Sequence, residues 1–192
     1  MKKLYTPMIL ALLAALLVQP ASSQKTVRMN LERMVASAGT IVHGTVTSVT
    51  TGADTDTRIL CTTVTIAVAE NFYGADQPSV TLKMVGGKAG KKTVRFAEMP
   101  RFTVGEEVYV LVHQPSQYGF TSPVGMGQGK FTVQRDAAAK TATVRNGAGN
   151  RHLFSGMKNV ALRSLTVTGD APEMSATELS SVLRSLVTSV KK

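Results

Sequence analysis

The chain has 192 residues, of which 22 are Lys or Arg and 12 are Asp or Glu, so its formal net charge is +10. This length suits one domain with a modest appendage, and a core of that size is stable without cross-links. The single cysteine, Cys61, excludes an intramolecular disulfide. Its strand-like surroundings favour a small buried hydrophobe over a reactive thiol or a covalent dimer.

The first residues have the pattern of a secretion signal. Lys2 and Lys3 precede an uncharged apolar run at 8–18, and small residues follow at 21–23. The run is too short to span a bilayer comfortably, which favours a cleaved signal peptide over an uncleaved anchor. We expect cleavage between Ser23 and Gln24 and an exported chain, periplasmic or extracellular, with no transmembrane segment after the signal.

Hydrophobic periodicity and turn residues predict the elements up to residue 85. Helical spacing of apolar residues predicts a short helix over 27–37, and alternation predicts the strands. In chain order we expect a strand at 40–50, a polar loop at 51–57, a strand at 59–69, a turn region at 70–78 and a strand at 79–85.

Short strands and glycine turns continue beyond residue 85. Gly86, Gly87 and Gly90 indicate a hairpin or bulge. A short strand at 93–96 is broken at Pro100. The remaining predicted elements are a turn at 104–106, a strand at 107–113 that is apolar on both faces, and strands at 130–134 and 141–145.

The C-terminal residues predict an amphipathic helix. Ser175 and Glu178 have the spacing of a capping box. One apolar stripe follows, formed by Leu179, Val182, Leu183, Leu186, Val187 and Val190. We expect this helix to dock on the strands; its Ser- and Thr-rich polar face argues against membrane adsorption, and partner binding is the alternative.

Basic residues concentrate in one segment. Without Lys2 and Lys3, 20 of the 22 basic residues remain against 12 acidic ones, a net charge of +8. The candidate binding patch consists of Lys83, Lys88, Lys91, Lys92, Arg95, Arg101 and Phe102, opposed locally by Glu98. It is either a solvated face or an anion-binding surface. Export and the lack of interleaved aromatic residues argue against nucleic acid. The expected partner is an acidic polymer or a protein of the cell envelope, and an anionic lipid surface is a further alternative.

We find no catalytic, metal or cofactor motif. The three histidines, His43, His113 and His152, lack zinc-ligand spacing, although the first two lie on strands that could approach each other. The glycine-rich run at 125–129 leads into a strand rather than a helix, which predicts a turn and not a dinucleotide loop. We expect Glu106 to cap the turn before the strand at 107–113.

Several motifs between residues 39 and 135 resemble a family of exported bacterial proteins without a settled function. The matching motifs are Gly44-Thr-Val46, Val68-Ala-Glu70 with Gly74, Gly86-Gly-Lys-Ala-Gly90, Met99-Pro-Arg-Phe102 with Gly105-Glu-Glu-Val108, and Gln128-Gly-Lys-Phe-Thr-Val133. Their order also looks like the oligonucleotide/oligosaccharide-binding (OB) barrel, in particular its netrin-like branch, which includes the tissue inhibitors of metalloproteases. Those inhibitors chelate zinc through an N-terminal cysteine, which a chain starting at Gln24 lacks.

The pattern and the resemblance together predict a mainly β protein, with a small antiparallel OB-like barrel, an N-terminal helical segment and a C-terminal amphipathic helix. The expected division is a signal peptide at 1–23, a helical segment at 24–38, the barrel at 39–146, a connecting segment at 147–172 and the helix at 173–192. Fold alone does not give function. We expect an exported, non-enzymatic binding module; the alternatives are a protease-inhibitor-like or protease-associated protein, and a hydrolase with a loop-assembled site.

Overall fold

The computed structural model describes residues 27–74, 77–158 and 173–191. The predicted signal peptide and residues 159–172 of the predicted connecting segment lie outside the described residues. The elements, in chain order, are α2 (Leu31–Ser37), β1 (Thr40–Ala53), β2 (Leu60–Tyr73), β3 (Ser79–Val85), β4 (Gly87–Ala89), β5 (Lys92–Val94), β6 (Glu107–Val112), the 3-10 helix η1 (Met126–Gly129), β7 (Lys130–Asp136), β8 (Thr141–Asn146), β9 (Met174–Ser175) and α4 (Ala176–Val190).

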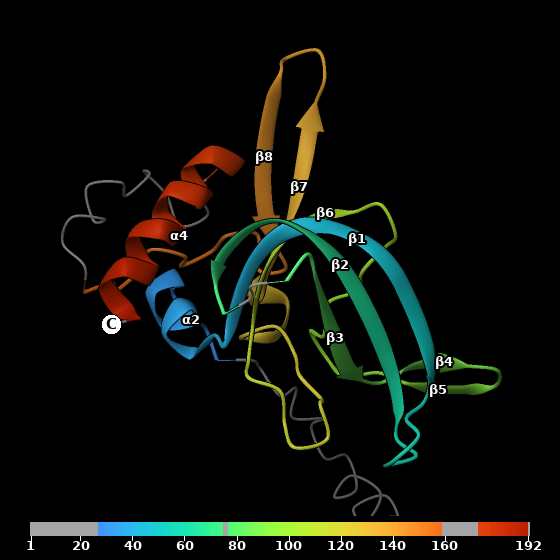
Figure 1. The fold of residues 1–192 in the computed structure, drawn as a ribbon. Helices are drawn as coiled ribbons and strands as arrows, with labels where there is room; N and C mark the ends of the chain where they lie inside the picture. Colours follow the sequence, from blue (N-terminus) through green and yellow to red (C-terminus); the bar gives the residue numbers. More distant parts are fainter. Residues whose placement is uncertain (1–26, 75–76, 159–172, 192) are drawn as a thin grey trace, which may run out of the picture.

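The described chain is mainly β, as the sequence predicted. Seven strands form one antiparallel sheet in the order β3-β2-β1-β6-β7-β8-β9, and β4 pairs with β5 in a second, two-stranded sheet. The predicted glycine turn at 86–90 is therefore a hairpin. Figure 1 shows this hairpin projecting from the sheet on the side away from α2 and α4. The OB-like topology and the closure of the barrel stay predictions.

β1 and β2 are longer and more curved than predicted. Their pairing extends from Ile41↔Tyr73 to Ala53↔Leu60, with register shifts along β1 that bend the pair. Figure 1 shows both strands arching over the rest of the sheet. Two predictions are therefore partly wrong: residues 51–53 of the predicted loop at 51–57 belong to β1, and residues 70–73 of the predicted turn region at 70–78 belong to β2. Threonines such as Thr51 and Thr62, whose hydroxyls lie 3.2 Å apart, continue the ladder without the apolar alternation that marks a strand.

The curved sheet has an apolar core on each side of β6. Val108, Val110 and Val112 pack into a cluster inside the curve, formed with residues of β1, β2 and β3. Tyr109 and Leu111 point the other way, into a larger cluster that includes both helices. This arrangement confirms the prediction of a strand buried on both faces, because β6 lies between β1 and β7 in the middle of the sheet.

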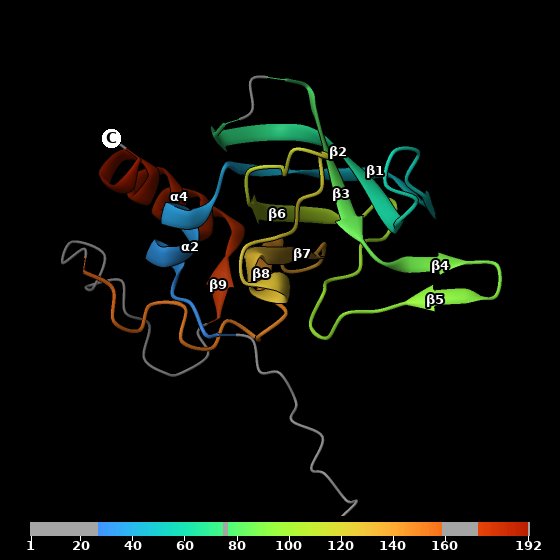
Figure 2. The ribbon, with the colours of Figure 1, turned by 90° about the horizontal axis from the view of Figure 1, so that it is seen from below.

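Both helices begin at side-chain caps and pack together on one side of the sheet. Asn30 accepts a hydrogen bond from the Arg33 N–H at the start of α2, and Ser175 with Glu178 forms the predicted capping box of α4. Leu179, Leu183 and Leu186 are fully buried, so the predicted docking face is confirmed. Figure 2 shows the two helices side by side at the end of the sheet away from β4 and β5. Within the described ranges, no helix is long and apolar enough to cross a membrane.

The bend in β1 depends on a glycine. An added Cβ at Gly44 would lie 2.0 Å from the Ala67 carbonyl oxygen, whereas one at Gly52 on the same strand would have nothing within 4 Å. We predict that Gly44→Ala lowers the free energy of unfolding by about 3 kcal/mol or more, because the β1–β2 pair must open to fit the methyl group. Urea denaturation measures this change. Gly52→Ala is the matched control and should change stability by about 0.5 kcal/mol or less; equal losses in the two variants would contradict the argument.

Candidate anion-binding groove

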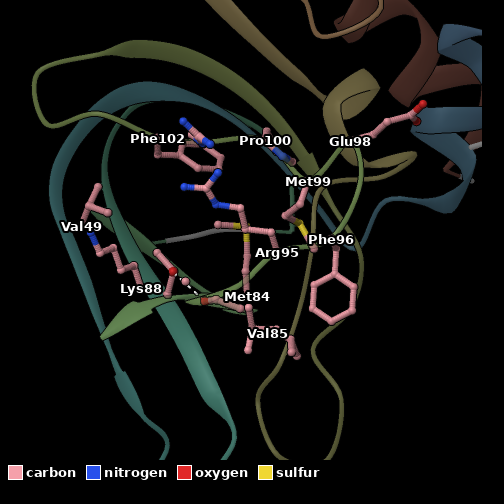
Figure 3. A pocket seen from close by; sticks show the side chains of 15 residues that line it. Val49, Met84, Val85, Lys88, Arg95, Phe96, Glu98, Met99, Pro100 and Phe102 are labelled. Atoms are coloured by element: carbon pink, nitrogen blue, oxygen red, sulfur yellow. Dashed lines mark hydrogen bonds between the residues drawn. The ribbon is translucent and has the colours of Figure 1, made fainter. Parts of the chain in front are cut away.

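A hollow of about 540 Å³ opens beside the β4–β5 hairpin; we call it the first hollow. Residues of β3, of the hairpin and of the loop 95–102 line it, with Val49 of β1 and Thr62 of β2. Figure 3 shows the side chains around it. The lining combines the basic side chains of Lys88, Arg95 and Arg101 with apolar surface from Val94 and Phe96, which are 41% and 48% exposed.

The structure divides the predicted patch. Lys88, Arg95, Arg101 and Phe102 line the first hollow, while Lys91 and Lys92 lie at the hairpin turn and are exposed. Phe102 is only 8% exposed, so it forms part of the wall rather than a free anchor. Lys83 has another role, because its Nζ lies 2.6 Å from Asp54 Oδ2 and 4.5 Å from the centre of the Phe120 ring.

A second hollow, of about 860 Å³, lies on the other side of the loop. Its lining comes from the segment before α2, from η1 and β7, and from the turn that follows β8. The basic side chains in that lining are Arg28, Arg101, Lys130, Arg145, Arg151 and the titratable His152. Among the described residues that line the two hollows, Glu98 is the one acidic side chain.

The two hollows share a wall, residues 98–101, which we call the ridge. Backbone conformation shapes it, since Glu98 adopts a positive φ of 61°. The Gly127 N–H donates a 2.9 Å hydrogen bond to the Glu98 carbonyl oxygen and so attaches the ridge to η1. In Figure 3 the Glu98 side chain points away from Lys88 and Arg95. Cations therefore dominate the first hollow although a carboxylate stands on its edge.

Lys130 holds the ridge from below. Its buried Nζ donates to the Arg101 carbonyl oxygen and to Glu106 Oε1, both at 2.6 Å, and lies 4.6 Å from the centre of the Phe102 ring. Glu106 also accepts hydrogen bonds from the Thr132 hydroxyl and the Thr103 N–H. The last of these bonds confirms Glu106 as the cap of its turn. A buried ammonium is stable only when it is paired, so these contacts determine the position of the loop.

Buried amides support the floor of the second hollow. Asn146 and Asn150 exchange backbone-to-side-chain hydrogen bonds of 2.9 and 2.8 Å, and the Asn146 side chain donates to the Gln128 carbonyl oxygen. The Gly147 N–H donates to the Gly127 carbonyl oxygen at 2.8 Å, and an added Cβ at Gly147 would lie within 3.1 Å of three Gly127 backbone atoms. The turn after β8 is therefore packed directly on η1, which places Arg145 and Arg151 beside the ridge.

The carboxylates with shifted pKa values hold cations of the protein itself. A hydrogen bond from Lys83, helped by the Thr57 N–H, holds the pKa of Asp54 far below its ordinary value. Hydrogen bonding from Arg135 lowers the pKa of Glu107 against the opposing effect of burial, and His43 adds to the lowering. Burial would raise the pKa of Glu106, but the bonds from Lys130 and Thr132 outweigh it and lower the pKa. In the described part of the chain, none of these ion pairs includes Lys88, Arg95, Arg101, Arg145 or Arg151.

His43 lies on β1 opposite Tyr109 of β6, whereas His113 follows the end of β6 at Val112, so the two are not opposite each other in the sheet. The His43 ring stacks on Tyr109 with centroids 4.3 Å apart, and its Nε2 lies 2.8 Å from Glu107 Oε1. Among residues 27–74, 77–158 and 173–191 there is no group of three or more His, Cys, Asp or Glu side chains placed to hold a metal ion. Cys61 is buried and free, as expected for a small apolar side chain.

Sequence reasoning missed the basic side chains of the second hollow. Arg28, Arg145 and Arg151 come from segments that are far from the predicted patch along the chain, and none stands in a cluster of basic residues. Packing of the turn after β8 on η1 brings Arg145 and Arg151 to the hollow that Arg101 also lines, and Arg28 reaches the same hollow beside His152. No local signal in the sequence indicates this convergence.

The chain was compared with protein-family models, with curated proteins and with solved structures, and no match was found in any of them. The resemblance to an exported, OB-like family therefore stays a prediction from the motifs.

The Glu106–Lys130 pair predicts a pH dependence of stability. Because the pKa of Glu106 in the fold is below its ordinary value of 4.5, its contribution is fully present above pH 4.5 and is lost as the pH falls through the lowered value. We predict that Glu106→Gln lowers the free energy of unfolding at pH 7 by about 2 kcal/mol, since Lys130 stays buried without its anion.

The same substitution should flatten the stability profile in acid. Chemical denaturation of wild type and Glu106→Gln between pH 3 and pH 7 measures both effects, and the difference between the proteins should narrow below pH 4.5. The role assigned to the Glu106–Lys130 pair would be contradicted if the difference in free energy of unfolding between wild type and Glu106→Gln stayed constant, or grew, as the pH falls.

Proposed function

We propose that this protein is an exported, non-enzymatic module that binds an acidic polymer of the cell envelope. The observation that carries the proposal is the first hollow, where Lys88, Arg95 and Arg101 line one concave surface and have no acidic partner among the described residues. Concave surfaces lined by one sign of charge focus the field and raise the local concentration of an oppositely charged ligand.

The contrast between paired and unpaired cations supports a ligand role. Lys83 and Lys130 are each neutralised by a carboxylate 2.6 Å away, and both serve the fold. Lys88, Arg95 and Arg101 are exposed and lie together, and Lys91 and Lys92 extend the same charge along the hairpin. Like charges kept close together without counter-charges destabilise a fold slightly, so binding of an anion there is favoured.

The lining favours an acidic polymer over nucleic acid. Grooves for single-stranded nucleic acid carry several exposed aromatic rings on which successive bases stack. In the described lining of both hollows the aromatic side chains are Phe96, which is half exposed, and the buried Phe102, with the imidazole of His152 in the second hollow. Recognition by charge, with one apolar contact at Phe96, suits a charged glycan.

The alternatives from the sequence have less support. A hydrolase needs a titratable group with a shifted pKa in its cleft. Asp54, Glu106 and Glu107 have lowered pKa values, but each is bonded to a cation of the protein and none is among the residues that line the two hollows. Protease inhibition rests on the netrin-like resemblance alone.

Charge reversal in the first hollow tests the proposal. We predict that Lys88→Glu with Arg95→Glu weakens binding of polygalacturonate, a linear acidic glycan, on the order of tenfold or more, because each substitution replaces an attraction by a repulsion. Isothermal titration calorimetry with residues 24–192 measures the affinity. Wild-type binding should also fall steeply from about 50 mM to about 500 mM salt, as the screening length shortens.

A matched control carries the same change in net charge elsewhere. Arg33→Glu with Lys140→Glu reverses two exposed cations, on α2 and at the turn between β7 and β8, that are not part of either lining. This variant should bind within about threefold of wild type, the loss that general charge alone causes. If the two double variants lose the same amount of affinity, the loss is caused by net charge and not by the first hollow, which contradicts the proposal. If wild type binds no acidic glycan at low salt, the proposal is overturned.

A further inference from the structure

We infer that the acidic polymer binds as a linear chain that crosses the ridge and occupies both hollows, with anionic groups in each. This inference rests on the proposed function and specifies its ligand: a polyanion whose charges repeat along an extended backbone, rather than a single compact anion.

The first argument is the continuity of the two hollows. They share the residues of the ridge as a common wall, and Arg101 lies in the lining of both. A ligand bound by Arg95 on one side therefore meets Arg101 next and the second hollow after it. Lys130 and Gly127 fasten the ridge from below, so the two hollows keep a constant relation to each other.

The second argument is the distribution of charge. Beyond the ridge, Arg145 and Arg151 add two exposed guanidinium groups, and Arg28 adds a third that lies 2.6 Å from His152 Nε2. No ion pair within the described residues neutralises Arg145 or Arg151. Guanidinium groups match carboxylate, sulfate and phosphate oxygens in bidentate geometry. A ligand confined to the first hollow would leave these groups unused.

The third argument is the carboxylate on the ridge. Glu98 repels an anionic group placed next to its carboxylate, so it disfavours ligands whose charges are closely spaced. It tolerates a chain that places an uncharged link next to Glu98 as it crosses the ridge. Acidic glycans have such uncharged links between their charged units. Glu98 therefore acts as a discriminating residue between the two cationic hollows.

A series of oligogalacturonates of increasing length, from about two to about twelve units, tests this inference by calorimetry. Linking two subsites in one ligand makes the second contact intramolecular, so affinity should rise with length by at least about tenfold and then level off once the chain reaches the second hollow. Arg145→Glu with Arg151→Glu should remove most of that rise and leave the short oligomers bound as in wild type. The Arg33→Glu, Lys140→Glu control should keep the rise.

The variant Glu98→Gln gives an independent readout. It should tighten the binding of long oligomers by about threefold and change the binding of the shortest ones less, because only long chains cross the ridge. Its expected effect is a gain, which a misfolded variant would not produce.

The possible failures are distinguishable. If oligomers of every length bind equally, or if Arg145→Glu with Arg151→Glu leaves the length dependence intact, the crossing is wrong while the proposed function stands. If that variant weakens short and long oligomers equally, the second hollow is not a separate subsite, and the inference is overturned. If no oligomer binds wild type at low salt, the proposed function itself fails.

Discussion

The candidate groove depends on one buried ammonium group. Lys130 lies at the start of β7, and its Nζ is held by the Arg101 carbonyl oxygen, the Glu106 carboxylate and the face of the Phe102 ring. Burying a charge costs several kcal/mol unless hydrogen bonds and an opposite charge offset the loss of water. The loop between β5 and β6 contributes all three partners. It can therefore move away only if the Lys130 ammonium group becomes exposed to water or stays buried without a partner. These contacts attach the wall between the two hollows to β7.

Polar networks perform the same task on the other side of the ridge. Asn146, Asn150 and Gln128 are buried, and their side-chain amides bond to backbone groups of η1, of β8, of the turn after β8 and of the segment before α2. A buried amide without partners is costly, so such networks select one arrangement of the loops they join. The consequence for function is that the exposed Arg145, near the end of β8, and Arg151, on the turn that follows, extend from a hydrogen-bonded base.

Much of the fold was predictable from local patterns. The capping box at Ser175, the apolar stripe from Leu179 onward and the continuous apolar run of β6 each specify an element through short-range physics, and the structure contains all three. The strand ends of β1 and β2 were not predictable in the same way. Their outer residues are threonines held by pairing with the other strand, so their extended conformation comes from the partner and not from a pattern of their own.

Local sequence patterns were sufficient to predict the mainly β class of the protein and half of its candidate site. Composition reports the net charge. The cluster of Lys88, Arg95 and Arg101 and the order of strands and turns depend on residues close together in the sequence, so spacing and periodicity report them. The internal ion pairs of Lys83 and Lys130 become visible in the folded chain alone. The same holds for the place of Arg28, Arg145 and Arg151 in the lining of the second hollow. The reason is that ion pairing and the convergence of the arginines depend on distances in space between separate segments of the chain; the paired residues are 29 positions apart for Lys83 and Asp54 and 24 for Lys130 and Glu106. These distances follow from sheet order and buried polar contacts that no short window of sequence contains.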